Sequence, residues 1–246
     1  MSDLHIITGS NGAGESSVGP RYSPERIFNQ GPVFDGDKLF VEKRKEFWQT
    51  IKSPKECNKL AYEFVVETFD RLLEKALAGR EDFAYEGHFT NEATWNIPRQ
   101  FLAGGYRIHL IYLGIKDTDL SERRVNDRSQ AGGHYVDPQT VADNFYGNLE
   151  KLNQHYGLFH SVKIIDSSKA RHTVLTIFDK GQPALAIPSY FSTIPPSGGR
   201  CTISSYPSSV SSISFTGISG LLVSPVPQYF RSSLLKISLH CSFPRA

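Results

Sequence analysis

Short apolar runs alternate with longer amphipathic segments along the chain, and this pattern predicts its secondary structure. Between 53 and 78, apolar residues recur every three or four positions, which is typical of a helix that buries one face, with Ser53 as its N-cap. Other segments of helical pattern are 38–50, 95–103, about 118–131 and 139–155. The apolar runs short enough for strands are 4–8, 32–37, 82–86, 106–114, 162–166 and 173–178.

Strands that alternate with helices predict a mostly parallel sheet with helices on both faces. The loop after the first predicted strand specifies the kind of α/β fold. It reads GSNGAGESS, which follows the phosphate-binding pattern G-x-x-x-x-G-K-[S/T] at all positions but one. The fold class that we expect is therefore the α/β P-loop nucleoside-triphosphate hydrolase/kinase fold.

The glycines of this loop would let backbone N–H groups converge on phosphate oxygens, and the following helix would add positive potential. Ser16 stands where a hydroxyl would bind Mg²⁺, and Glu15 stands where the pattern has lysine, so the side-chain charge is reversed. The predicted nucleotide-binding residues are Gly9, Ser10, Asn11, Gly12, Ala13, Gly14, Glu15, Ser16 and Ser17.

Further candidate residues follow the next strands. Asp35 and Asp37 end the strand predicted at 32–37, and Glu86 ends the one at 82–86, where carboxylates would face the ligand crevice of an open α/β sheet. Arg124 and Arg128 are four residues apart, which places both on one face of a helix. Fixed cations of this kind stabilise the charge that develops in phosphoryl transfer, although a solvated basic face is the simpler interpretation.

Charge divides the chain near Gly181. All 25 acidic residues lie at or before Asp179, whereas the 181–246 segment carries four basic residues and is rich in Ser and Pro. We therefore expect a kinase-like domain over 1–180 and a tail over 181–246 that is poorly ordered. A frameshifted segment and a small β-rich module are the alternatives for the tail.

The remaining composition excludes several classes of protein. A net charge of +2 predicts no steering toward nucleic acid or a membrane surface, and no apolar run approaches the length that spans a bilayer. The three cysteines, Cys57, Cys201 and Cys241, lack the spacing of metal ligands. Because the first segment reads as a strand and not as a signal peptide, a reducing, cytoplasmic location is expected.

Four motifs in order resemble the zeta toxin family of P-loop kinases: the glycine-rich loop, DGD at 35–37, EGHFT at 86–90, and RVNDRSQAGGHYVD at 124–137. The resemblance covers roughly residues 3–180. It implies transfer of phosphate from ATP, with Mg²⁺, to a sugar hydroxyl of UDP-N-acetylglucosamine. It also implies an antitoxin protein as a possible partner.

The resemblance further implies roles for individual residues. Asp37 matches the base that deprotonates the attacking hydroxyl, and Arg124 and Arg128 match the lid arginines on the phosphates. His134 fits a G-G-H-x-V variant of that lid. The residues implied in substrate binding are Asp35, Glu86, His88 and Thr90, with His88 in place of the threonine in the family's E-G-T segment.

Glu15 leaves three interpretations open. The chain is an attenuated kinase of this type, a nucleotide-binding protein without turnover, or a different P-loop ATPase or kinase. A carboxylate near the γ-phosphate replaces attraction with repulsion, and loss of one transition-state charge contact costs about 10²–10³ in rate. Asp37, Glu86 and the arginine pair favour a kinase lineage over a switch GTPase, and the sequence has no guanine-reading segment such as NKxD.

Overall fold

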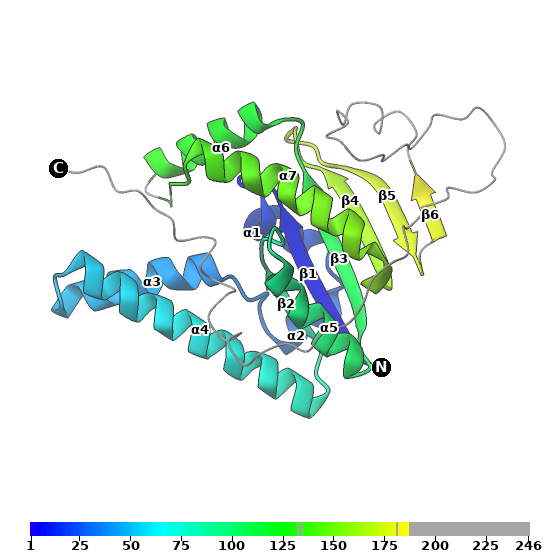
Figure 1. Cartoon of the computed structure of the whole chain (residues 1–246), viewed down its shortest axis with the longest axis horizontal. Coiled ribbons are helices and arrows are strands. Elements are labelled where there is room, and N and C mark those ends of the chain that lie inside the picture. Colours follow the sequence, from blue (N-terminus) through cyan, green and yellow to red (C-terminus); the bar gives the residue numbers. More distant parts are fainter. Residues whose placement is uncertain (132, 134, 181, 187–246) are drawn as a thin grey trace.

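A six-stranded sheet with helices on both faces forms the body of the protein in a computed structural model, which describes residues 1–131, 133, 135–180 and 182–186 (Figure 1). The strand order is β2-β1-β3-β4-β5-β6. The strands β2, β1, β3 and β4 are parallel to one another, whereas β5 is antiparallel to β4 and β6 is antiparallel to β5. The strands are β1 (Asp3–Gly9), β2 (Phe83–Glu86), β3 (Arg107–Gly114), β4 (Ser161–Asp166), β5 (Thr173–Asp179) and β6 (Gln182–Ala186).

The helices largely follow the amphipathic segments of the sequence. They are α1 (Glu15–Val18), α2 (Glu25–Gln30), α3 (Gly36–Thr50), α4 (Pro54–Gly79), α5 (Asn96–Ala103), α6 (Thr118–Gln130) and α7 (Pro138–His155), with 3₁₀ turns at Gly19–Tyr22, Glu92–Trp95 and Tyr156–Leu158. Ser53 caps α4 as predicted, because its hydroxyl accepts from the Glu56 amide. None of the described helices is long and apolar enough to cross a membrane.

Alternating side chains of the central strands form a separate core on each face of the sheet. Leu4 and Ile6 of β1 pack against α4, α5 and α7 in the larger core, and Ile7 packs in the smaller core with Val18 and Leu113. The pair α3 and α4 extends away from the sheet as a helical hairpin with its own small core (Figure 1).

The segment 32–37 differs from its prediction. Phe34 makes a single bridge to Tyr85, through Phe34 N–H to Ala84 O and Glu86 N–H to Phe34 O, and no longer strand forms. The reason is Asp35, whose carboxylate accepts from the Lys38 amide at 2.9 Å and so starts α3 directly after the bridge. Asp37 therefore lies in the first turn of a helix and not at the end of a strand.

The predicted boundary near Gly181 lies within the edge of the sheet, because β6 begins at Gln182 and pairs with β5. The rest of the predicted tail, 187–246, lies outside the described residues, as do Gly181 and His134. The division into a kinase-like domain and a tail therefore stays a proposal.

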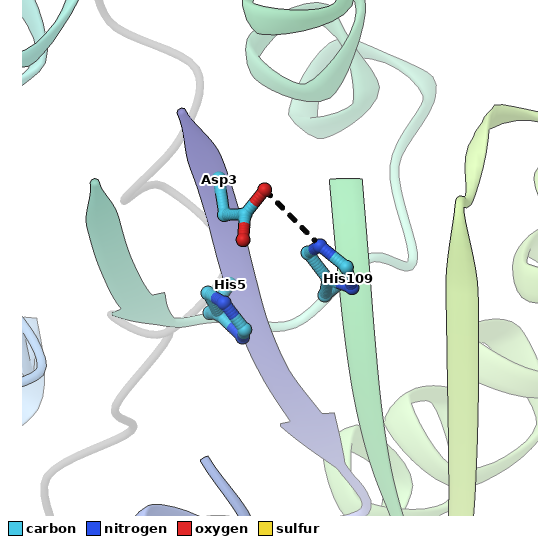
Figure 2. Close-up of side chains that lie close together, drawn as sticks. All are labelled: Asp3, His5 and His109. Atoms are coloured by element: carbon cyan, nitrogen blue, oxygen red, sulfur yellow. Dashed lines mark ion pairs between the residues drawn. The ribbon is translucent and has the colours of Figure 1, made fainter. Parts of the chain in front are cut away.

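A buried polar cluster occupies the opposite end of the sheet from the glycine-rich loop. Asp3, His5 and His109 project from β1 and β3 on one face, with the two rings stacked at 4.7 Å (Figure 2). Their metal-ligating atoms lie within 4.8 Å of one another. The Asp3 carboxylate, however, already forms ion pairs with Arg26 and Arg107, so its charge is neutralised without a metal ion. We therefore regard the cluster as part of the core.

Candidate functional site

The glycine-rich loop connects β1 to α1 at the carboxyl end of the sheet. The chain crosses from β1 to β2 on one side and continues to β3 on the other, which makes β1 the place where the connections change direction. Open α/β sheets bind ligands at such positions. Gly12 and Gly14 have φ of +75° and +95°, and a Cβ on Gly9 would come within 2.4 Å of the Leu113 carbonyl oxygen, so the loop needs its glycines.

Side chains from two helices hold the carbonyl groups of this loop. Ser121 of α6 donates to the Asn11 carbonyl at 2.5 Å and Arg124 donates to the Gly12 carbonyl at 3.2 Å. Asn148 of α7 donates to the Gly9 carbonyl at 2.7 Å. Because a trans peptide directs its C=O and N–H in opposite directions, these contacts fix where the following N–H groups point. Contacts with α6 and α7 therefore help to define the conformation of the loop.

The helix after the loop is a single turn. α1 ends at Val18, and Pro20 lies in the 3₁₀ turn that follows it. The macrodipole depends on aligned peptide units over several turns, so α1 contributes little of the positive potential that the sequence pattern predicts. Any phosphate here depends on backbone N–H groups and on side chains of other elements.

A pocket joins the loop to β2 and to the start of α3. It brings together nine of the predicted site residues: Asn11, Gly12, Glu15, Ser16, Asp35, Asp37, Glu86, His88 and Arg128. The predicted residues that are not among its lining are Gly9, Ser10, Ala13, Gly14, Ser17, Thr90 and Arg124. Thus most of the polar side chains that the motifs nominated meet at one place.

The two arginines of α6 have different surroundings. Arg124 is half-buried and donates to the carbonyls of Gly12, Ser167 and Ser168 at 2.8–3.2 Å, whereas Arg128 lines the pocket. The next turn closes α6, because Gly133 N–H donates to the Arg128 carbonyl at 2.9 Å. The geometry therefore separates a loop-holding arginine from one that can reach a ligand.

Glu15 extends into the pocket beside Gly9. Its Oε1 atom is buried and has no hydrogen-bond partner among the described residues. Burial raises the pKa of this carboxyl, although nearby His88 and Arg128 oppose that effect. The residue that replaces the loop lysine is thus held in conditions that favour its neutral form.

Glu86 and Ser16 are in direct contact. The Ser16 hydroxyl donates to Oε2 of Glu86 at 2.8 Å. Burial, followed by the negative charge of Asp35, raises the pKa of Glu86 to about 8. The oxygen atoms gathered here belong to a hydroxyl and several carboxylates. Mg²⁺ prefers hard oxygen ligands of this kind, so the residues present fit that ion.

Aromatic side chains form the remainder of the pocket lining, and the sequence motifs did not identify them. Phe34, Phe69, Tyr85 and Phe89 contribute rings. Tyr85 is 2% exposed, and its hydroxyl has no hydrogen-bond partner among the described residues. An aromatic surface next to carboxylates suits a ligand with both an apolar face and hydroxyl groups.

Sequence reasoning also missed the buried asparagines of α7. Asn144 and Asn148 occupy the inward face of the helix together with Val141 and Leu152. Both asparagines occur at the three- and four-residue spacing of the buried apolar positions in this helix. That spacing could have identified them, since buried amides need defined partners.

Comparison with known proteins agrees with this architecture. A family model described as Zeta toxin matches residues 3–175. Comparison with curated protein sequences finds no match.

Two solved structures share the fold. The crystal structure of AvrRxo1-ORF1 with AvrRxo1-ORF2 and ATP is similar with a TM-score of 0.54 and 11% identity, over 75% of this chain and 60% of that one. The PezAT chromosomal toxin-antitoxin system of the human pathogen Streptococcus pneumoniae matches with a TM-score of 0.50 and 16% identity, over 72% and 71%. This chain thus spans about 60% of the length of the AvrRxo1 chain. The family model covers most of the chain. The chain therefore belongs to the zeta toxin family and has the P-loop kinase fold of that family.

Proposed function

We propose that the protein is an ATP-dependent kinase of zeta toxin type that phosphorylates a sugar hydroxyl of UDP-N-acetylglucosamine or a similar small metabolite, attenuated by Glu15. One observation carries the proposal: a single pocket joins Gly12 and Ser16 of the nucleotide loop to Asp37, Glu86 and Arg128. The similar crystal structure of AvrRxo1-ORF1 with AvrRxo1-ORF2 and ATP supports ATP as the donor. We place the reaction in the cytoplasm.

Asp37 is the general base in this proposal. It lines the pocket on the first turn of α3, where its exposed carboxylate can meet an acceptor hydroxyl. It accepts the hydroxyl proton while the hydroxyl oxygen attacks the γ-phosphorus and the bond to the ADP oxygen breaks. Arg128 offsets negative charge on the transferred group.

Ser16 and Glu86 would hold Mg²⁺, which neutralises charge on the β- and γ-phosphates when bound. Their hydrogen bond places a hydroxyl and a carboxylate at the same position beside the loop. Asp35 lines the pocket as a substrate-binding candidate, and its carboxylate also caps α3 and so fixes the start of the helix that carries Asp37. Among the remaining predicted residues, His88 lines the pocket as a substrate-binding candidate, and Thr90 packs against α7 near Gly147.

The main alternative is a nucleotide-binding protein without turnover, and Glu15 is the observation that favours it. An ionised carboxylate beside the γ-phosphate would repel it in a site where charge is poorly screened. A different P-loop ATPase or kinase is the third possibility. A protein antitoxin is the proposed partner, since the PezAT relative is a toxin-antitoxin system.

The decisive experiment restores the lysine. Glu15→Lys and the native chain are incubated with Mg·ATP and UDP-N-acetylglucosamine, and ADP and any phosphorylated sugar nucleotide are detected by phosphorus NMR. We expect Glu15→Lys to exceed the native chain by at least about 10², the scale of one transition-state charge contact. Equal turnover by both would contradict attenuation by Glu15. ADP without a phosphorylated acceptor would favour an ATPase.

A further inference from the structure

α7 carries two buried asparagines whose contacts differ. Asn144 is 3% exposed and Asn148 is 1% exposed. They are four residues apart, so both face the sheet on one side of the helix. A buried primary amide offers two donors and an acceptor, and these are costly to leave unpaired. The partners of each amide therefore show what the helix holds in place.

Asn148 connects two loops that lie far apart in the sequence. Its Nδ2 donates to the Gly9 carbonyl at 2.7 Å, at the start of the nucleotide loop. Its Oδ1 accepts from the Phe89 amide at 2.5 Å, in the loop that follows β2. The Asn148 side chain therefore joins the loop for the nucleotide to the loop that carries Glu86 and His88, beside a direct contact of 3.3 Å between His88 Nδ1 and the Gly9 carbonyl.

The second loop is fixed on its other side as well. The Phe89 carbonyl accepts from Trp95 Nε1 at 3.2 Å, and the Gly87 amide donates to the Ile7 carbonyl at 3.1 Å. Phe89 itself is 3% exposed. Movement of the Phe89 peptide is therefore resisted from both directions, and movement of Asn148 would be transmitted to it.

A glycine next to Asn148 permits this close approach. A Cβ on Gly147 would come within 3.1 Å of Thr90 Cγ2 and 3.2 Å of Thr90 Cβ. α7 thus lies directly against the loop after β2 at the position where the bridging amide crosses. A larger residue at 147 would require Thr90 to move by a few tenths of an ångström.

Asn144 provides an internal comparison. Its Nδ2 donates to Oδ1 of Asn11 at 2.7 Å, within the nucleotide loop. Among the described residues, Asn144 forms no hydrogen bond with the loop after β2. The two asparagines therefore share a helix, a face and a degree of burial but differ in whether they join both loops.

We propose that Asn148 is a positioning residue that couples nucleotide binding to acceptor binding. An occupied nucleotide loop holds the Gly9 carbonyl, and through Asn148 it orders the Phe89 peptide and with it the acceptor side of the pocket. By reciprocity, acceptor binding tightens the nucleotide site by the same factor. The proposal rests on the proposed function for the identity of the second ligand, but the connection between the loops does not.

The test compares four proteins in a Glu15→Lys background: the parent, Asn148→Asp, Gly147→Ala and Asn144→Ala. Asn148→Asp keeps the acceptor for the Phe89 amide and loses the donor to Gly9. The affinity for a non-hydrolysable ATP analogue is measured by calorimetry with and without UDP-N-acetylglucosamine. We expect the acceptor to tighten analogue binding about five- to tenfold in the parent, within the usual range of coupling between sites.

The variants separate coupling from simple damage to the loop. In Asn148→Asp the coupling factor falls to about one, and in Gly147→Ala it is reduced. In Asn144→Ala the analogue binds more weakly but the coupling factor is retained. Parental coupling in Asn148→Asp, equal loss in Asn144→Ala, or a parent that binds both ligands without coupling would each overturn the proposal.

A second measurement does not need the acceptor. Hydrogen exchange at the Phe89 amide is followed with and without the ATP analogue. We expect the analogue to slow this exchange about tenfold in the parent and in Asn144→Ala, but not in Asn148→Asp. If UDP-N-acetylglucosamine does not bind while this pattern holds, the acceptor assignment fails and the coupling role stands. If the analogue slows Phe89 exchange equally in Asn148→Asp, the role of Asn148 is refuted.

Discussion

The hydroxyl of Ser16 donates a hydrogen bond to Oε2 of Glu86 at 2.8 Å, which joins the nucleotide loop to the end of β2. These two residues come from motifs 70 positions apart, one nominated for a metal ion and the other for the substrate. Their contact means that a cation at Ser16 would also meet Glu86. The protonation state of Glu86 therefore affects both the loop and the stability of the protein.

Stability should fall with rising pH because of Glu86. Burial and the neighbouring Asp35 raise its pKa to about 8, from an ordinary value of 4.5. Above pH 4.5 the unfolded chain loses this proton while the folded chain keeps it, so the free energy of unfolding decreases until about pH 8. We expect Glu86→Gln to remove this dependence and to stabilise the protein at pH 8 by on the order of 2–4 kcal/mol. Urea denaturation at several pH values measures it, with exposed Glu67→Gln as the control.

Substitutions of the two arginines of α6 should have different effects: that of Arg124 mainly on stability, and that of Arg128 mainly on binding of an ATP analogue. Arg124→Ala leaves the carbonyls of Gly12, Ser167 and Ser168 without their donor, so we expect it to lower the free energy of unfolding by about 2–3 kcal/mol. Arg128 is exposed and lines the pocket, so we expect Arg128→Ala to lower stability less than Arg124→Ala does and to weaken binding of an ATP analogue about tenfold. Thermal denaturation and calorimetry give both quantities. Equal loss of stability in the two variants would show that the geometry does not distinguish them.

Asp37 should matter for transfer and little for binding. In the Glu15→Lys background, we expect Asp37→Asn to reduce phosphoryl transfer by at least about 10², the lower end of general-base catalysis. Nucleotide affinity should change little, since the carboxylate faces the acceptor in the proposed reaction. Phosphorus NMR follows the product, and calorimetry follows the nucleotide. Full turnover by Asp37→Asn would remove this residue from the mechanism.

The stacked histidines should make the protein sensitive to acid. Burial, followed by the charge of His109, lowers the pKa of His5 to about 3, and burial lowers that of His109 to about 4. Because an unfolded chain takes up protons at these histidines below about pH 6.5, stability is fully present above that pH and is lost as the pH falls toward 3. His5→Phe keeps a ring against His109 and should make the decline between pH 6.5 and 4 shallower. The denaturant midpoint is measured at several pH values across that range for both proteins. If it falls with decreasing pH as steeply in His5→Phe as in the native chain, the buried histidines are not the cause of the acid sensitivity.

The sequence predicted correctly the elements that are determined by residues close to one another in the chain. The periodic stripe and Ser53 cap located α4 to within one residue at its end, and the glycine-rich loop after β1 identified the fold. The prediction of a strand over 32–37 was wrong because the Asp35 carboxylate accepts a hydrogen bond from the Lys38 amide. This single cap starts α3 at the point where the strand was expected to continue. Of the predicted strand, only the bridge between Phe34 and Tyr85 forms.

The site could be predicted from sequence only as a set of motifs. Spacing placed Arg124 and Arg128 on one face of α6, but only the packing of that helix shows that one holds carbonyls and the other lines the pocket. The bridge made by Asn148 depends on loops centred on residues 9 and 89, which no local pattern connects. Contacts of high sequence separation are the part of the site that one sequence does not reveal.

Nucleotide binding by the native chain should depend on pH through Glu15. Burial raises the pKa of this carboxyl in the ligand-free protein, and an incoming triphosphate favours the neutral form further. We therefore expect the affinity for an ATP analogue to increase as the pH falls from 8 to 5, with uptake of a proton on binding. Calorimetry in buffers of different ionisation enthalpy measures that proton directly.

Two variants at the same position complete this test. Glu15→Gln keeps the size of the side chain without its charge, so its affinity should be nearly independent of pH and should match that of the native chain at low pH. Glu15→Lys should bind more tightly than both, because it adds an attraction where Glu15→Gln only removes a repulsion. If Glu15→Gln instead retains the native pH dependence, the titrating group is elsewhere in the pocket, with Glu86 the first to be tested. If Glu15→Lys binds no better than Glu15→Gln, position 15 does not face the phosphates, and the attenuation proposed for this kinase loses its physical basis.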